Sequence, residues 1–343
     1  MKHDMQDILG LVRSGQLMDA TRRIQENLGG DSAVQHEAAP DMKDITPRPT
    51  LLEGPLPPIQ AKPKRTRPAT VRTSGANGMT MHQGERPYRV FSPSVVRAGA
   101  PLIMMLHGCT QTPEDFAAGT RMNAAAEAAG AHVIWPEQTR SENANGCWTW
   151  FDPAHQGQGG EAAILSRIAQ DVAARVSAGG GVHVAGLSAG GAMAAILATA
   201  YPGQFTSVGV HSGLPVGSAQ DVMSAFAAMR SGGRAARIIP IPAIIFHGTA
   251  DQTVATVNGE TLAKAPKGAD KPRQRKAEMA GRTVTVTRAT GPKGGVLREY
   301  WEVDGLGHAW SGGSAAGSYA DPAGPDATRE MVRFFAEARA ARG

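Results

Sequence analysis

The 343-residue sequence is poor in cysteine, in aromatic side chains and in long apolar runs. It holds 2 cysteines, and aromatic residues make up 5% of it. Two cysteines are too few for a disulfide-stapled scaffold or for a structural zinc site. No stretch of the sequence approaches the ~20 apolar residues that a membrane-spanning helix needs, so we expect no transmembrane helix. The first ten residues lack the apolar region of a secretory signal, and none is predicted.

A strong charge of one sign is also missing. Lys and Arg number 35 against 30 Asp and Glu, which gives a formal net charge of +5. The basic residues form no nucleic-acid-binding motif, so a solvated surface is favoured and no nucleic-acid partner is expected. Hydrophobic residues make up 41% of the chain, enough for a sizeable core, and the 42 glycines predict many tight turns.

The composition changes twice along the chain, which predicts three regions. Residues 1–30 have apolar positions near helical spacing and are expected to form a short helical segment, for which self-association is one candidate role. Residues 31–78 are rich in proline and basic side chains, as is typical of a flexible linker. Residues 79–343 are expected to form the catalytic domain.

From residue 79 onward, short apolar stretches typical of strands alternate with longer stretches typical of helices. The expected strands are 88–91, 101–106, 131–135, 182–185, 206–210, 242–246 and 297–303. The expected helices are 114–129, 160–177, 190–201 and 326–341. This alternation predicts an α/β fold with a mostly parallel central sheet and helices on both faces.

A serine stands at the centre of the pentad Gly186-Leu187-Ser188-Ala189-Gly190. An expected buried strand ends just before the pentad, and an alanine-rich helix follows it. A G-x-S-x-G sequence in this strand–turn–helix setting is the nucleophile elbow of the α/β-hydrolase fold. We therefore predict an α/β-hydrolase with Ser188 as its nucleophile. The alternative is a glycine-rich turn with an incidental serine.

A serine hydroxyl is a weak nucleophile, so a carboxylate and then a histidine base are expected later in the chain. Asp251 follows the strand predicted at 242–246, and His308 follows the last predicted strand. Asp304 is a rival for the acid, but it precedes His308 by only four residues and is poorly placed to face it. The predicted triad is Ser188, Asp251 and His308.

Two backbone N–H groups should hold the oxyanion that forms during acyl transfer. One is the amide of Ala189, directly after the nucleophile, and the other is the amide of Cys109, in the loop after the strand 101–106. Cys147 lies in a long loop at the same expected edge of the sheet, so a disulfide with Cys109 would clamp the oxyanion loop. Two unpaired thiols are the alternative, which a reducing compartment favours.

Three of the chain's 5 tryptophans, Trp148, Trp150 and Trp310, fall in loops that are expected to surround Ser188. Flat apolar rings in such loops are suited to a polyester chain or an aromatic acyl group. Packing of the same loops against the sheet is an equal alternative. His211, at the end of another expected strand, is predicted to line the wall of the cleft.

Four motifs occur in a fixed order: His107-Gly108-Cys109-Thr110-Gln111, Gly146-Cys147-Trp148-Thr149-Trp150, the serine pentad and Gly307-His308-Ala309-Trp310. With them, residues 80–340 resemble the esterase/polyhydroxybutyrate depolymerase family of α/β-hydrolases. The resemblance implies hydrolysis of polyhydroxyalkanoate polyesters, or of feruloyl and acetyl esters on plant polysaccharides. It implies no metal and no organic cofactor, and the partner is the ester substrate.

The same resemblance implies the Ser188–Asp251–His308 triad and a Cys109–Cys147 disulfide. Many members of the family are secreted, whereas the missing signal peptide favours the cytoplasm, so the compartment stays open. Residues 264–295 depart from the family as a basic, glycine-rich insert that affects the rim of the cleft. A polymer-granule-binding protein on the same scaffold is the non-enzyme alternative, but it would have lost a triad residue.

Overall fold

The computed structural model describes residues 78–341. The expected helical segment 1–30 lies outside the described residues, as does the linker 31–78 except for its last residue. The self-association expected of residues 1–30 falls outside them too. The fold described below is therefore that of the region predicted to be catalytic.

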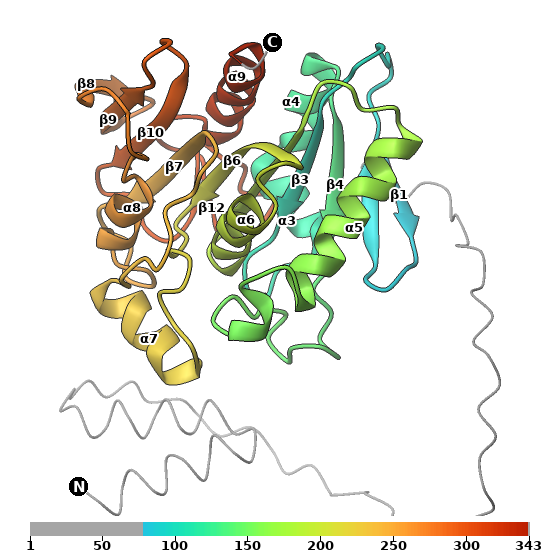
Figure 1. Ribbon diagram of the computed structural model, residues 1–343, viewed down its shortest axis with the longest axis horizontal. Helices are drawn as coiled ribbons and strands as arrows, with labels where there is room; N and C mark the ends of the chain where they lie inside the picture. The colour runs from blue at the N-terminus through green and yellow to red at the C-terminus, as the bar shows by residue number, and fades with distance from the viewer. Residues whose placement is uncertain (1–77, 342–343) are drawn as a thin grey trace, which may run out of the picture. The chain divides into compact units, whose positions relative to one another are not determined.

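Within residues 78–341, ten strands form one sheet in the order β1-β2-β4-β3-β5-β6-β7-β10-β9-β8. The strands are β1 (Met79–His82), β2 (Tyr88–Phe91), β3 (Leu102–Leu106), β4 (His132–Pro136), β5 (Val182–Leu187), β6 (Phe205–His211), β7 (Ala243–Gly248), β8 (Arg273–Met279), β9 (Arg282–Thr290) and β10 (Val296–Val303). The six central strands run parallel, and the strands beyond them at each edge pair antiparallel. This confirms the expected α/β fold (Figure 1).

Helices cover both faces of this sheet and bury a separate apolar cluster on each. The helices are α3 (Pro113–Thr120), α4 (Met122–Ala129), α5 (Gly160–Arg175), α6 (Ala189–Ala200), α7 (Val222–Ser231), α8 (Val257–Leu262) and α9 (Ala327–Ala340), with a short 3-10 turn η1 at Pro153–His155. Side chains of α5, α6 and α7 belong to one cluster, and those of α3, α4 and α9 belong to the other. Figure 1 looks onto the face that α5 and α6 cover. Strands β3 to β7 are buried along their whole length because helices cover both faces of the sheet there. A small second sheet pairs β11 (Trp310–Ser311) with β12 (Ala320–Asp321).

The helix expected over 114–129 is interrupted. Arg121 separates α3 from α4 and has a left-handed conformation, with φ 55°. Its amide closes α3 on the carbonyl of Ala117, and its guanidinium donates to the carbonyl of Gly312 at 2.6 Å. The expectation of one continuous helix was wrong because this contact with a distant loop offsets a local conformation that a non-glycine residue otherwise avoids.

The insert expected at 264–295 contains a complete β-hairpin. Strands β8 and β9 pair from Arg273–Arg288 to Met279–Arg282 and extend the sheet beyond β10. Ala280 and Gly281 form the two-residue turn between them, both with positive φ, as the twist of a hairpin favours. Three basic side chains of the insert, Arg273, Arg275 and Lys276, thus lie on the edge strand β8, where charge opposes pairing with another chain.

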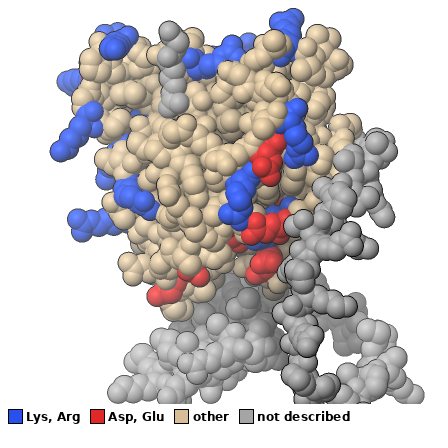
Figure 2. All heavy atoms as spheres, turned by 45° about the vertical axis from the view of Figure 1, so that its right-hand side comes forward, with Lys and Arg blue, Asp and Glu red and all other residues tan. Residues whose placement is uncertain are grey.

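Charged side chains are dispersed on the face that Figure 2 brings forward, where acidic and basic groups lie beside one another. Arg167 on α5 and Glu85 in the β1–β2 turn form an ion pair in which both side chains are exposed. Among residues 78–341, no helix is long and apolar enough to cross a membrane.

Candidate active site

Ser188 occupies a strained turn between β5 and α6. Its φ is 57° and its ψ is −122°, a conformation that costs a non-glycine residue free energy and is common where function requires it. Its amide donates to the carbonyl of His211 at 2.9 Å, which fixes the turn against β6. A Cβ at Gly190 would lie 2.1 Å from the carbonyl oxygen of Leu106, so only glycine allows α6 to start this close to β3. The pentad therefore forms the elbow that its sequence predicts.

The loop His107–Gln111, which follows β3, passes directly beside this turn. A Cβ at Gly108 would lie 3.6 Å from the Cβ of Ser188. Among the described residues, the amide of Cys109 has no hydrogen-bond acceptor, and neither does that of Ala189, the first residue of α6. The first N–H groups of a helix have no partner within it and carry the positive end of its dipole. Two amide donors are thus available beside Ser188.

Several contacts hold the His107–Gln111 loop in place. Cys109 and Cys147 form a disulfide, with their Cα atoms 4.3 Å apart. Trp148 donates its indole N–H to the carbonyl of His107 at 3.1 Å, and the buried His107 accepts from the amide of Gln138 through Nε2 at 3.1 Å. Burial lowers the pKa of His107, which keeps it neutral and able to accept. The loop is therefore anchored both covalently and by buried hydrogen bonds.

Asp251 and His308 form a hydrogen-bonded pair at the same edge of the sheet. The distance from His308 Nδ1 to Asp251 Oδ2 is 2.8 Å. The other carboxylate oxygen accepts from the amides of Thr253 at 3.0 Å and Val254 at 2.8 Å. Burial alone would raise the pKa of Asp251, but the bond and charge of His308 and the amide of Val254 outweigh it, and the pKa is lowered. Asp251 is thus a carboxylate that orients the His308 imidazole.

The rival acid lies elsewhere. Asp304 accepts a hydrogen bond from the hydroxyl of Thr249 at 3.0 Å and is exposed. His308 is partly exposed, with 11% of its side-chain surface accessible. Within residues 78–341, the hydroxyl of Ser188 makes no hydrogen bond in this structure. A catalytic contact between serine and histidine often forms only when substrate binds.

The three tryptophans and His211 are buried, whereas we expected them to line the cleft and contact the substrate. Trp148 and Trp310 are fully buried, Trp150 is 5% exposed and His211 is completely buried. The indole of Trp310 donates to Thr328 at 3.0 Å, and its ring stacks on His211 at 5.1 Å. These side chains pack the loops against the sheet, which was the alternative reading of the three tryptophans. His211 is a core residue that accepts from the amide of Ser311 through Nε2 at 3.0 Å, and it does not line a cleft.

Sequence reasoning missed a buried network around Gln111. Its Oε1 accepts from the amide of Gly108 at 2.9 Å, and its Nε2 donates to Asp115 at 2.9 Å and to the carbonyl of Ser318 at 3.0 Å. Asp115 also accepts from the amide of Ser318 at 2.8 Å. Next to Ser318, the ring of Tyr319 lies edge-on to His308 at 6.3 Å. Gln111 therefore links the loop beside Ser188 to the segment that follows His308. Gln111 belongs to the His107–Gln111 motif, but nothing in the sequence around it indicated a role for its side chain.

The described residues contain no group of three or more His, Cys, Asp and Glu side chains that could hold a metal ion. The fold and the site geometry define an α/β-hydrolase: a mostly parallel sheet, a serine on the strand-to-helix elbow, and an acid–histidine pair after later strands. The profile described as Esterase PHB depolymerase matches residues 88–266, more than half of the chain. The chain belongs to this family.

Curated relatives are similar to this chain in sequence, and one solved structure shares its fold. The chain is 34% identical over 183 residues to Poly(3-hydroxyalkanoate) depolymerase C from Paucimonas lemoignei, which covers 48% of this chain and 44% of the relative. It is 30% identical over 127 residues to Feruloyl esterase B from Neurospora crassa, covering 36% of this chain and 42% of the relative. The chain thus spans less than half the length of these two relatives. The acetyl xylan esterase from Aspergillus awamori has the same fold, with a TM-score of 0.53 at 18% identity over 70% of this chain and 94% of that one.

Proposed function

We propose that this chain is a serine esterase that hydrolyses carboxylic esters through an acyl-enzyme. The observation that carries the proposal is the placement of Ser188 on a strained elbow beside the unpartnered amides of Cys109 and Ala189. The Asp251–His308 pair supplies an oriented base at the same edge of the sheet. This combination of nucleophile, base, orienting acid and paired amide donors is what acyl transfer requires.

In the proposed reaction, His308 accepts the Ser188 proton through Nε2 while Ser188 Oγ attacks the ester carbonyl carbon. The amides of Cys109 and Ala189 donate to the oxyanion, and Asp251 accepts from Nδ1 of the imidazolium. The alcohol leaves with the proton that His308 returns. His308 then deprotonates a water molecule, which attacks the acyl-enzyme carbonyl; as the bond to Ser188 Oγ breaks, His308 returns the proton to Oγ and the acid is released.

The proposed substrate is a polyhydroxyalkanoate, such as polyhydroxybutyrate, or its oligomers. The family to which the chain belongs and the depolymerase from Paucimonas lemoignei support this choice. A feruloyl or acetylxylan ester, or another polyester, is the second candidate, favoured by the match to Feruloyl esterase B. Turnover of polyhydroxybutyrate film compared with that of methyl ferulate separates the two, because each candidate predicts which substrate is preferred.

Release of p-nitrophenol from p-nitrophenyl butyrate tests the mechanism. We expect Ser188→Ala to abolish turnover and Asp251→Asn to lower kcat by about 10⁴-fold. Asp304→Asn is the matched control and should leave kcat nearly unchanged, since Asp304 bonds to Thr249 and not to His308. Full activity of Ser188→Ala would disprove the serine mechanism. A wild-type protein that adsorbs to polymer without any turnover would support the granule-binding alternative.

A further inference from the structure

The β8–β9 hairpin, which the proposed function does not use, forms one wall of a groove on the α9 side of the sheet. Register places Arg273, Arg288 and Glu299 in one row across β8, β9 and β10, and Arg275, Val286 and Trp301 in the next row. Directly paired residues of neighbouring strands share a face, so all six side chains point the same way. The groove has a volume of about 480 Å³, within the range of small-molecule sites.

Two of the arginines in this groove have their charge compensated. Arg288 bonds to Glu299 at 3.0 Å and also to Glu337. Arg333 on α9 bonds to Glu330 at 2.7 Å and also to Glu299 and Glu337. All three glutamates are therefore engaged by Arg288 and Arg333.

The other two arginines are not compensated. The side chains of Arg273 and Arg275 are exposed. Within residues 78–341, neither guanidinium has an acidic partner or a hydrogen-bond acceptor. Arg273 is also directly opposite Arg288, and two like charges in this position repel each other. Four arginines and two glutamates line the groove, and Glu337 outside it pairs with Arg288 and Arg333, so one positive charge is left in excess. The uncompensated positive charge of the groove therefore favours the binding of a single anionic group beside β8.

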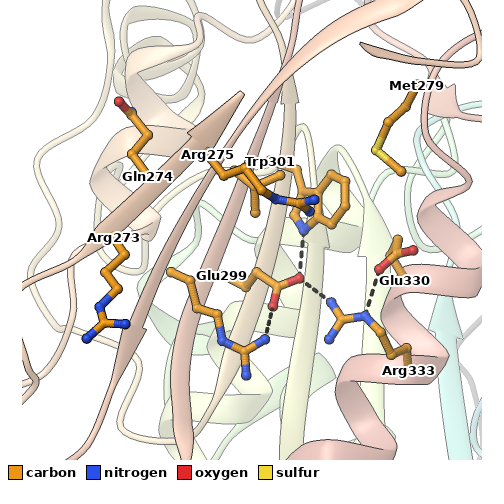
Figure 3. A pocket seen from close by; sticks show the side chains of 10 residues that line it. Arg273, Gln274, Arg275, Met279, Glu299, Trp301, Glu330 and Arg333 are labelled. Atoms are coloured by element: carbon orange, nitrogen blue, oxygen red, sulfur yellow. Dashed lines mark hydrogen bonds and ion pairs between the residues drawn. The ribbon is translucent and has the colours of Figure 1, made fainter. Parts of the chain in front are cut away.

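The floor of the same groove is apolar. Trp301 and Val286 are buried beneath it, and Met279 closes one end. Figure 3 shows Arg273 and Arg275 extending from β8 on one side, Glu330 and Arg333 on α9 on the other, and Trp301 between them. A second hollow of about 520 Å³ adjoins the groove and shares Arg273 and Arg288 with it, which leaves room for an extended ligand.

We propose that this groove binds an organic carboxylate with an apolar chain, its carboxylate held by Arg273 and Arg275 and its chain lying over Val286 and Trp301. A guanidinium forms two parallel hydrogen bonds to a carboxylate, and the excess of one positive charge matches a monoanion. No residue that lines the groove belongs to the site around Ser188, so the proposal stands apart from the proposed esterase reaction.

Calorimetric titration of the full chain with sodium decanoate, below its micelle concentration, tests this site. We expect saturable binding that Arg275→Gln weakens by about tenfold, the effect typical of losing one charge-assisted pair. Lys276→Gln is the matched control, because it removes the same charge from the next residue of β8, which points to the opposite face. It should change the affinity by less than about twofold. The neutral analogue decanamide should bind at least tenfold more weakly than decanoate.

Four results would overturn the proposal. One is the absence of saturable decanoate binding, and another is equal binding of decanoate and decanamide, which would leave only an apolar patch. A third is an equal loss of affinity in the Arg275→Gln and Lys276→Gln variants, which would indicate nonspecific attraction to a basic edge. The fourth is a dimer that Arg275→Gln dissociates without any decanoate binding, which would assign the groove to a second copy of the chain.

Discussion

The hydrogen bonds of Gln111 help to hold the loop that carries the amide of Cys109 beside Ser188. Gln111 is 6% exposed, and its carboxamide is bonded at both ends, to the loop beside the serine and to Asp115 and Ser318. In the proposed mechanism it is a positioning residue, because it holds the loop that carries one oxyanion donor without touching the substrate. Its effect should therefore appear in the transition state rather than in substrate binding.

Replacing Gln111 with leucine removes these bonds while keeping similar volume. Loss of a whole oxyanion donor typically costs about 10²–10³-fold in kcat, and a displaced donor should cost part of this, about 10–100-fold. We expect KM for p-nitrophenyl butyrate to change little. Gln170→Leu, on exposed α5 surface, is the control and should be neutral. A variant with unchanged kcat, or with a loss confined to KM, would contradict the positioning role.

His211 makes the stability of the fold depend on pH. Burial, together with the nearby His247 and His308, lowers the pKa of His211 to about 3. In the unfolded chain the group titrates near 6.5, so between these values the unfolded state binds a proton that the folded state does not. The stabilisation is complete above about pH 6.5 and is lost as the pH falls towards 3.

Chemical denaturation at pH 7.5 and pH 5.0 measures this contribution. One proton bound on unfolding corresponds to about 1.4 kcal/mol per pH unit, so the neutral His211 should account for about 2 kcal/mol of the stability lost between these conditions. His211→Gln should reduce the loss by this amount, since Gln can still accept from Ser311 without titrating. An identical pH dependence in wild type and His211→Gln would refute the assignment.

At the scale of elements, the strand–elbow–helix unit was predictable and the surrounding loops were not. The conformation of the serine pentad depends on two local features, the buried strand before it and the glycine at which α6 passes close to β3. Both features can be recognised in the sequence. The burial of Trp148 depends on the disulfide and on the His107 carbonyl, which only the folded chain brings together. The break at Arg121 likewise depends on Gly312, 191 residues away. The Ala280-Gly281 pair is only a weak indication of a hairpin turn. The charged β8 sequence before it lacks the apolar alternation that would identify a strand.

The close packing of α6 against β3 can be tested with a graded series of glycine substitutions. A Cβ at Gly190 would lie 2.1 Å from a backbone carbonyl oxygen, one at Gly191 would lie 3.0 Å from another, and one at Gly203 would meet nothing within 4 Å. We expect Gly190→Ala to destabilise the fold by more than about 3 kcal/mol and Gly191→Ala by about 1–3 kcal/mol. Gly203→Ala should be neutral or slightly stabilising. Thermal unfolding gives the order, and a Gly190→Ala protein as stable as Gly203→Ala would contradict this packing.

At the scale of the whole molecule, the residues of the proposed mechanism and both apolar clusters lie within residues 78–341. Ten strands of the sheet lie in this region, and the loops after its strands carry Ser188, Asp251 and His308 to one edge. Fold class could be read from sequence because the alternation of strands and helices is a linear feature of the chain, and the order Ser188, Asp251, His308 is the linear feature on which the proposed triad rests. The placement of the hairpin at the far edge could not, because nothing local indicates which strand β9 pairs with.

Removing residues 1–77 separates the esterase reaction from any role of the N-terminal region. Because no residue of the proposed mechanism is removed, we expect kcat/KM for p-nitrophenyl butyrate to stay within about threefold of the full chain. Ser188→Ala in the shortened protein serves as the control for background hydrolysis. If the shortened chain keeps its circular dichroism and thermal midpoint but loses more than about tenfold in kcat/KM, the N-terminal region contributes to the site and the boundary at residue 78 is wrong. Sedimentation reports on self-association through residues 1–30, and adsorption to polyester film reports on polymer contact. At least one of the two should change on removal, and a shortened chain unchanged in both would contradict the role predicted for this segment.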